Sequence, residues 1–436
     1  MHIVTVPAKN QNQAMYALVD CNSFFCSVEK VFHPGLGGKP VVVLSSNDGC
    51  IVALTPEAKA AGLHRGDPIF KVRDIVERNN VHVFSTNMRL YAAMSDRVTD
   101  ILRKSITHVE KYSIDESFCD LEGYDRYHTL TDFMRGVAEE IRLYTDIPVS
   151  VGIAPSKTLA KIGSKFAKQY EGYRGVCAID TDAKRRKALS LFPLSDVWGI
   201  GRHTLEKLLY HGITTPLDFA DRKESWVRSH LFLPGVQTWL ELNGTPCIDT
   251  HEIRRNTNIC TSRSFGNMIA DIASLRSAIA SFAASCANKL RGQGSVARTV
   301  TVFVMSNRFR DDLPQYANSA SRSLSVATSD TMELTSAAME ALMSIFLPGI
   351  RYKKAGVVLS DIVPAAPFEQ YLFDEIKNRP QRKDLMRVMD DINCRHGVKT
   401  LHLAVEGVDK EAWHVRSEYR SPNYLTDIDE ILTIKI

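Results

Sequence analysis

The feature that most constrains this chain is a pair of adjacent carboxylates, Asp115 and Glu116, between two short runs of strand-forming residues. Residues 109–114 carry β-branched and aromatic side chains, and residues 118–121 resume that pattern. Side chains of one straight strand alternate between its two faces. The two acids can therefore serve one site only where the chain turns, as at the tip of a β-hairpin.

A third carboxylate, Asp20, ends the apolar run at residues 16–19, which is typical of a buried strand. Three acids at strand ends, brought together by a fold, could hold two Mg²⁺ ions roughly 4 Å apart for in-line phosphoryl transfer. Hard oxygen ligands suit Mg²⁺ and leave room for substrate phosphates. Acidic pairs at strand ends are more often solvated turn residues, so this hypothesis depends on the rest of the chain.

The order of the expected elements gives a reason for the acids to meet. If residues 21–84 are set aside, the chain up to residue 154 reads β-α-β-β-α-β, with helices at 88–105 and 130–143. That order predicts an α+β, ferredoxin-like fold, with an antiparallel sheet and helices on one face. Asp20 would then end a central strand beside the Asp115 hairpin. A second β-α-β-β-α-β order is expected from residue 249, after a helical stretch at 191–244.

Bulk composition narrows the class of protein. The 436 residues are too many for one simple core and indicate three or four domains. The nine cysteines include no Cys-x-x-Cys pair, so zinc sites and disulfide frameworks are not expected and a cytoplasmic location fits. No apolar run is long enough to span a bilayer, and residues 1–14 lack a signal-peptide core. The net charge of +4 gives only weak support for a polyanionic partner.

Four motifs in the chain resemble those of the Y-family, or translesion, DNA polymerases. They are, in order, residues 20–25 (DCNSFF), 112–118 (YSIDESF), 151–161 (VGIAPSKTLAK) and 198–201 (WGIG). The resemblance is strongest to the UmuC branch, the catalytic subunit of bacterial DNA polymerase V, and it covers residue 15 to the C-terminus. Residues 47–50 and 262–266 also resemble that branch.

This resemblance implies a domain layout. It predicts an N-terminal extension over 1–14 and a ferredoxin-like palm over 15–24 and 85–180, interrupted by a fingers lobe over 25–84. A helical thumb with a helix-hairpin-helix would span 181–248. A second β-α-β-β-α-β unit, the DNA-binding little finger, would span 249–362, and residues 363–436 would bind the clamp and partners.

The implied activity is error-prone translesion synthesis by a DNA-directed DNA polymerase in the SOS mutagenesis response. Asp20, Asp115 and Glu116 would be the catalytic metal ligands, with the backbone carbonyl of Cys21 as a further ligand, and two Mg²⁺ ions as cofactors. The implied partners are primer-template DNA, dNTP, a UmuD-type subunit, a RecA filament and the β sliding clamp.

The nucleotide and DNA contacts are also inferred residue by residue. Phe24 and Phe25 would lie on the nucleotide side, Phe25 as the ring that excludes a 2′-hydroxyl and Phe24 as core. Lys59 and Lys157 would bind the triphosphate, Lys157 at a helix start that already favours anions. Lys161, one helical turn further on, could contact either phosphate or DNA. The other candidate DNA contacts are Gly199, Gly201, Arg263, Arg298 and Arg308. The candidate clamp-binding peptide contains Gln370, Leu372 and Phe373.

Two other functions are compatible with parts of the pattern. Another two-metal phosphoryl enzyme on a similar palm, such as a nucleotidyl cyclase, would not need the thumb hairpin or the second basic domain. A DNA-binding factor that kept the fold and lost its chemistry would not need Asp20, Asp115 and Glu116.

Overall fold

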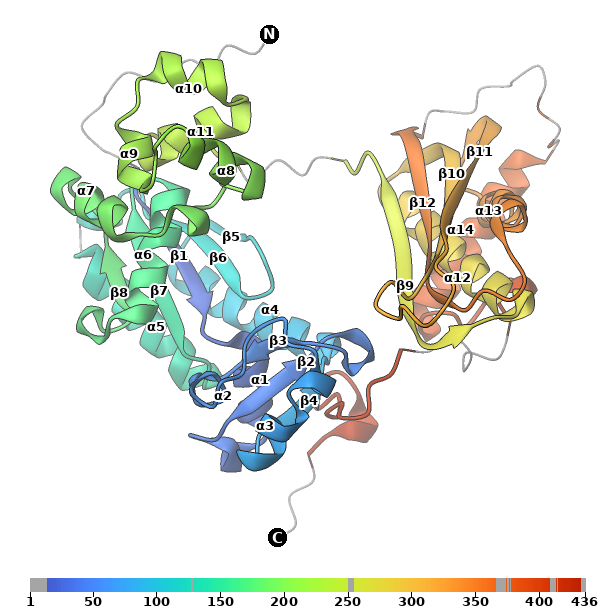
Figure 1. The fold of residues 1–436 in the computed structure, drawn as a ribbon, viewed down its shortest axis with the longest axis horizontal. Coiled ribbons are helices and arrows are strands. Elements are labelled where there is room, and N and C mark those ends of the chain that lie inside the picture. Colours follow the sequence, from blue (N-terminus) through green and yellow to red (C-terminus); the bar gives the residue numbers. More distant parts are fainter. Residues whose placement is uncertain are drawn as a thin grey trace. The chain divides into compact units, whose positions relative to one another are not determined.

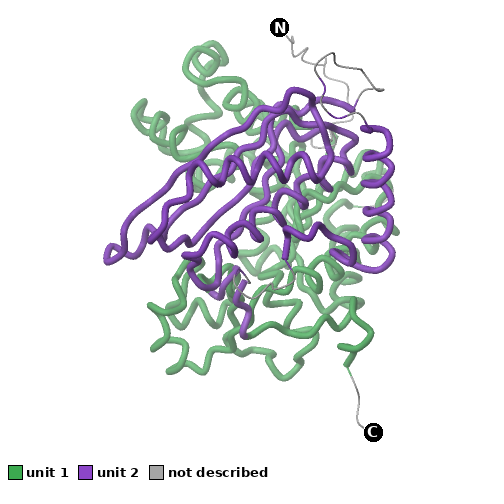
Figure 2. The backbone as a smooth tube through the Cα atoms, turned by 90° about the vertical axis from the view of Figure 1, so that its right-hand side faces the viewer, with its two compact units in different colours: residues 1–45, 49–253, 419–436 green, residues 46–48, 254–418 purple. Residues whose placement is uncertain are grey.

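The computed structural model describes residues 14–126, 129–249, 255–365, 374, 376, 378–407, 413 and 415–432. The chain divides into two compact units (Figure 2). Unit 1 comprises residues 1–45, 49–253 and 419–436, and unit 2 comprises residues 46–48 and 254–418. In the described part of the chain, no helix combines the length and the apolar character needed to cross a membrane.

The central sheet of unit 1 has the strand order β5-β6-β1-β7-β8. Its strands are β1 (Tyr16–Cys21), β5 (Val109–Lys111), β6 (Glu116–Asp120), β7 (Val149–Ala154) and β8 (Val176–Ala178). The expected antiparallel core is present, since β1 pairs with both β6 and β7 in antiparallel register. Strand β8, parallel to β7, was not anticipated by the sequence.

The two helices of the predicted β-α-β-β-α-β order lie on one face of this sheet, as expected, and a third helix covers the other face. The helices are α4 (Met88–Ser105), α5 (Leu130–Thr145) and α6 (Lys157–Gln169). Ala17 and Val19 of β1 pack with residues of α4 and α5, whereas Leu18 between them packs with residues of α6. Helix α6 lies so close to β7 that a Cβ at Gly152 would be 2.0 Å from the carbonyl oxygen of Ala160.

The rest of unit 1 forms a small sheet and a helical segment (Figure 1). The sheet has the order β3-β2-β4, with β2 (Val41–Leu44), β3 (Ile51–Leu54) and β4 (His82–Ser85). Around it lie α1 (Phe24–Phe32), α2 (Pro56–Ala60) and α3 (Arg73–Arg78). The helical segment contains α7 (Asp182–Leu191), α8 (Arg202–Tyr210), α9 (Pro216–Ala220), α10 (Glu224–His230) and α11 (Leu233–Leu242).

Unit 2 has the predicted β-α-β-β-α-β order. It runs β9 (Ile259–Ile269), α12 (Ile272–Gly292), β10 (Ser295–Ser306), β11 (Ala317–Thr328), α13 (Thr331–Ile345) and β12 (Tyr352–Pro364). The strand order is β11-β10-β12-β9, and α12 and α13 share one buried core with the sheet. A further helix, α14 (Arg379–His396), is held by ion pairs between Arg291 and Asp390 and between Arg382 and Asp330.

Candidate active site

The three acids predicted from the sequence meet at one corner of the central sheet. Asp20 of β1 is the direct cross-strand partner of Glu116 of β6. The backbone N–H of Cys21 donates a hydrogen bond to the carbonyl oxygen of Asp115 over 2.9 Å. Antiparallel pairing of β1 with the hairpin therefore brings together residues that lie about a hundred positions apart in the sequence.

Ser113 holds the turn that carries the adjacent acids. Its hydroxyl accepts hydrogen bonds from the backbone N–H groups of Asp115 and Glu116, over 3.2 and 3.0 Å. The same hydroxyl donates to the Asp115 carboxylate over 2.5 Å. A side chain two residues upstream thus fixes the bend that straight strand geometry would not allow.

Two lysines of α6 face this corner, because Asp20 shares the face of β1 that packs against α6. The Lys161 ammonium lies 2.8 Å from both carboxylate oxygens of Glu116. The Lys168 ammonium lies 3.6 Å from an oxygen of Asp20. The corner is therefore a mixed cluster of carboxylates and lysines.

Burial raises the pKa of Asp20 to about 6. This value already includes the positive charges of Lys168 and Lys161, which oppose the effect of burial, and the negative charges of Glu116 and Asp115, which act in the same direction as burial. A carboxyl in this environment is one that an added cation would stabilise in its charged form.

The corner has the oxygen donors for a hard divalent cation, but these donors do not form a preorganised coordination site. Across the described ranges of the chain, no three His, Cys, Asp or Glu side chains are grouped closely enough to hold a metal ion. Glu116 and Asp20 are paired with lysines instead. The donor chemistry, three carboxylates with a raised pKa among them, nevertheless fits such an ion.

Lys157 does not reach this corner. Its ammonium lies 2.8 Å from the Glu110 carboxylate, and the two side chains are only 7% and 11% exposed. Glu110 pairs with Phe118, which in turn pairs with Leu18, so this ion pair lies further along the strands than Asp20.

The backbone N–H groups at the start of α6 already have hydrogen-bond acceptors within the protein. Ser156 caps the helix by accepting from the N–H of Leu159, and the carboxylate of Glu241 in α11 accepts from the N–H of Thr158. A buried carboxylate at this helix N-terminus takes the place that a phosphate was expected to fill. The structure therefore gives the expected triphosphate role of Lys157 no support.

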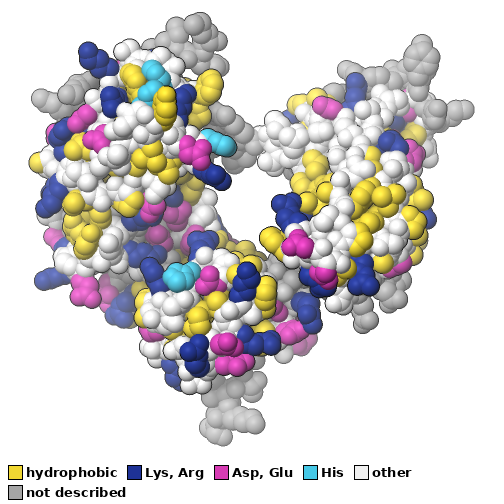
Figure 3. All heavy atoms as spheres, viewed as in Figure 1, with side chains coloured by type: hydrophobic (Ala, Val, Ile, Leu, Met, Phe, Trp, Pro, Cys, Tyr) yellow, Lys and Arg dark blue, Asp and Glu magenta, His cyan; other side chains and the backbone are white. Residues whose placement is uncertain are grey.

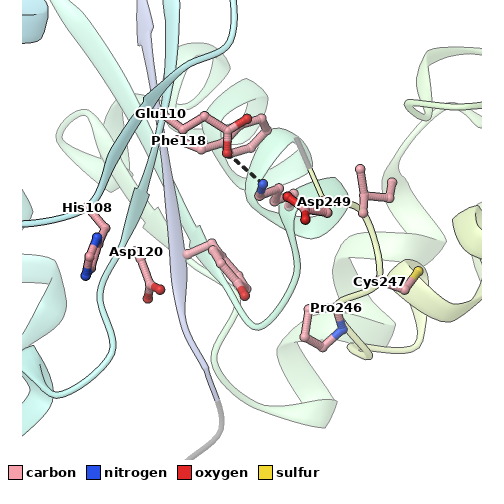
Figure 4. A pocket seen from close by; sticks show the side chains of 10 residues that line it. His108, Glu110, Phe118, Asp120, Pro246, Cys247 and Asp249 are labelled. Atoms are coloured by element: carbon pink, nitrogen blue, oxygen red, sulfur yellow. Dashed lines mark hydrogen bonds and ion pairs between the residues drawn. The ribbon is translucent and has the colours of Figure 1, made fainter. Parts of the chain in front are cut away.

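A cavity of about 400 Å³ lies beside this ion pair, at the far end of the same sheet face (Figure 4). Its lining includes Tyr16 and Asp120, which are cross-strand partners four residue pairs away from Asp20 and Glu116 along the pairing register. The cavity is closed on another side by residues 246–249. It is thus separate from the acidic corner.

The expected helix-hairpin-helix segment contacts the corner through Trp198. The Lys161 ammonium lies 4.8 Å from the Tyr112 ring centre and 5.4 Å from that of Trp198. Gly199 has φ +94°, and a Cβ there would be 2.3 Å from the Thr238 hydroxyl. Gly199 is therefore required for packing. Gly201, at the start of α8, is exposed and has open space around its Cα.

The two phenylalanines after the first acid differ as expected. Phe24 is buried in the core, 3% exposed. Phe25 is partly buried, and its ring stacks on Tyr91 of α4 with 4.6 Å between centroids and 17° between planes. Lys59 is exposed on the short helix α2.

The remaining sequence-predicted residues lie on unit 2 or outside the described residues. Arg263 of β9, Arg298 of β10 and Arg308 beyond β10 are exposed. On the visible face, Lys and Arg side chains are dispersed among other types and form no continuous stripe (Figure 3). The candidate clamp peptide with Gln370, Leu372 and Phe373 lies outside the described residues.

Lys168 is a site residue that sequence reasoning missed. Lys161 and Lys168 are seven residues apart on one helix, a spacing that places both on the same face. This seven-residue spacing is the sequence signal that could have identified Lys168, whose ammonium lies beside Asp20.

The chain is similar in sequence to one protein family and to several characterised relatives. The chain matches the impB/mucB/samB family over residues 19–165, the C-terminal domain of that family over 256–372, and a domain of unknown function (DUF4113) over 383–434. It is 40% identical to the protein UmuC of Salmonella typhimurium over 423 residues, 97% of this chain and 100% of that protein. It is 30% identical to DNA polymerase IV of Methanoculleus marisnigri over 350 residues, 78% of this chain and 92% of that protein.

A solved structure has a similar fold. The Y-family DNA polymerase chimera Dbh-Dpo4(243-245)-Dbh superposes with a TM-score of 0.62 at 21% identity, covering 80% of this chain and 99% of that one.

Proposed function

The chain belongs to the impB/mucB/samB family and is a UmuC-type Y-family DNA polymerase, and from this premise we propose that it performs error-prone translesion synthesis in the SOS response. It would add deoxynucleotides to a primer 3′ end opposite damaged template bases. The observation that carries this proposal is the direct pairing of Asp20 with Glu116, next to Asp115.

We assign the metal site to Asp20, Asp115 and Glu116, with the carbonyl oxygen of Cys21. Two bound Mg²⁺ ions would supply charge neutralisation at the attacking and leaving oxygens of phosphoryl transfer. The protein's own contribution is to hold these carboxylates at the ends of two interior strands of the sheet, where Ser113 fixes the turn.

The triphosphate role is assigned to Lys168 and Lys161, with Lys59 of the fingers as a further contact. Both α6 ammonium groups already lie against the acids of the corner. Their positive charge beside the site would favour an anionic substrate and stabilise departing pyrophosphate. Lys157, paired with the largely covered carboxylate of Glu110, is assigned a structural role.

Phe25 is proposed as the ring that excludes the 2′-hydroxyl of a ribonucleotide. Its ring is held flat against Tyr91, which would keep it from rotating away from a bound sugar. Phe24, being buried, would only support this arrangement from the core.

The DNA contacts and partners complete the proposal. Gly201 at the start of α8 and the exposed Arg263, Arg298 and Arg308 would bind DNA phosphates, which give affinity without sequence preference. A UmuD-type subunit, a RecA filament and the β sliding clamp are proposed partners, the clamp through residues 370–373. The expected palm, fingers, thumb, little finger and C-terminal boundaries are retained as part of this proposal.

The test is primer extension by the purified full chain past a template abasic site, with and without a UmuD-type protein and RecA. Extension past the lesion with dNTP in preference to rNTP supports the proposal. Extension on undamaged template that always stops at the lesion, under all these conditions, would exclude the translesion role.

A further inference from the structure

The C-terminal segment 419–432 returns to unit 1 and packs against the fingers and palm (Figure 1). It adds to the end of β4: Arg420 bridges to Ser85 in parallel register, and the Tyr419 N–H donates to the Ser85 hydroxyl over 2.9 Å. The Asn87 side chain, which caps α4, donates to the carbonyl oxygens of Ser421 and Pro422. We call residues 419–432 the strap.

The strap supplies a hydrogen bond to a buried carboxyl. Ser421, 5% exposed, donates its hydroxyl proton to an oxygen of Glu29 over 3.0 Å. Glu29 is fully buried on α1, and the Tyr91 hydroxyl donates to the same oxygen over 2.6 Å. The other Glu29 oxygen is buried and has no hydrogen-bond partner among the described residues. Loss of the Ser421 hydroxyl would therefore leave this carboxyl with a single donor, which is costly in a low-dielectric interior.

Tyr91 links this buried network to the substrate side. Its hydroxyl holds Glu29, and its ring stacks on Phe25. A second anchor keeps the strap in place, because the Tyr424 ring stacks on Phe32 of α1 at 4.8 Å. The contacts thus run from the strap through Glu29 and Tyr91 to Phe25.

We propose that the strap is a positioning element for sugar selection, acting through the Ser421–Glu29–Tyr91 network on Phe25. This inference rests on the proposed function of Phe25. It gives a role to the end of residues 383–434, the stretch that matches a domain of unknown function (DUF4113). Residues 419–432 then belong structurally to the nucleotide site rather than serving only to bind partners.

The test compares Ser421→Ala with wild type in single-nucleotide insertion of dNTP and rNTP, measuring kcat and KM separately. The variant is expected to raise relative rNTP efficiency roughly fivefold, the effect of losing about one hydrogen bond. The change should appear mainly in KM for rNTP. Ile428→Ala, at an 82% exposed position of the same strap, should match wild type.

A double variant separates positioning from general damage. In a Phe25→Ala background, where the ring is absent, Ser421→Ala should change sugar selectivity no further. An unchanged dNTP-to-rNTP ratio in Ser421→Ala, or an equal effect in both backgrounds, would overturn the role of the strap. Absence of any dNTP insertion by wild type would instead contradict the proposed polymerase function. Thermal unfolding of each variant shows that the comparison is made on folded protein.

Discussion

Asp20 and Glu116 are direct cross-strand partners at the end of β1 and β6, so their side chains leave the sheet on the same face. Two lysines of α6 meet them there. This relationship explains how carboxylates far apart in the sequence share one environment. We therefore expect the activity to be sensitive to individual charges at the ends of these two strands.

Asp20→Asn or Glu116→Gln should each reduce primer extension about 100-fold or more, because a metal ligand contributes several kcal/mol to the transition state. Asp120→Asn is the matched control, since Asp120 lies on the same strand and face but opposite Tyr16. It should retain near wild-type extension. If Asp20→Asn extends primers as well as Asp120→Asn, the catalytic assignment is wrong.

Lys168→Ala should raise the KM for dNTP roughly tenfold, the effect of losing one charged hydrogen bond. Lys157→Met should instead destabilise the fold by about 3 kcal/mol, because it removes the ion pair with Glu110, in which the two side chains are only 7% and 11% exposed. Steady-state kinetics and chemical unfolding separate the two effects. Lys165→Ala removes a half-exposed ion pair with Asp196 and a contact with the Phe192 ring, and it should change neither the KM for dNTP nor the stability by a comparable amount. A raised KM in the Lys157 variant alone would reverse the assignment.

The acidic corner could be predicted from the sequence because it depends on local patterns and topology. Strand alternation and the β-α-β-β-α-β order together place Asp20 beside the Asp115 hairpin, and the register confirms this. The side of the sheet covered by α6 could not be predicted in the same way. An amphipathic pattern says which face of a helix is apolar, but not which face of the sheet it covers.

For the same reason, the sequence could not show which carboxylate each lysine of α6 would contact. Residues 157, 161 and 168 all lie on α6, and only contacts across to β5, β6 and β1 distinguish their partners. The contact of the strap with α1 could not be predicted from the sequence either, because Ser421 reaches Glu29 through a hydrogen bond between residues 392 positions apart. Such contacts leave no hydrophobic periodicity in the sequence.

Gly199→Ala should destabilise the helical segment of unit 1 by about 2 kcal/mol, because the new side chain is strained at positive φ and meets the Thr238 hydroxyl. Gly201→Ala is the matched control, with extended backbone and open space at the same short segment. Urea unfolding measures both. Equal stability of the two variants would show that the Gly199 contact is not needed for the fold.

The arginines of unit 2 should control the salt dependence of DNA binding. Arg263→Ala, Arg298→Ala and Arg308→Ala should each lower the slope of log affinity against log salt by about one, if each contacts one phosphate. Arg310→Ala is the control, because Arg310 is exposed but already paired with Asp312 at 2.6 Å. Fluorescence anisotropy across a salt series gives the slopes. Unchanged slopes in all three variants would remove these residues from the DNA interface.

Glu29 should make stability fall as pH rises. Burial raises the pKa of its carboxyl above the ordinary value of 4.5, although hydrogen bonds from Tyr91 and Ser421 oppose the shift. The folded state therefore holds the proton more tightly than the unfolded state, so this stabilisation is complete below about pH 4.5 and is lost as pH rises through the folded pKa.

Glu29→Gln removes that titration, so its Tm relative to wild type should increase from pH 5 to pH 8. Glu139→Gln is the control, because Glu139 is exposed and Arg142 holds its pKa below the ordinary value. Its Tm difference from wild type should show no such increase with pH. Parallel Tm curves for Glu29→Gln and wild type would mean that the buried carboxyl beneath Tyr91 does not titrate differently on folding. The strap would then hold a group of fixed charge across this range.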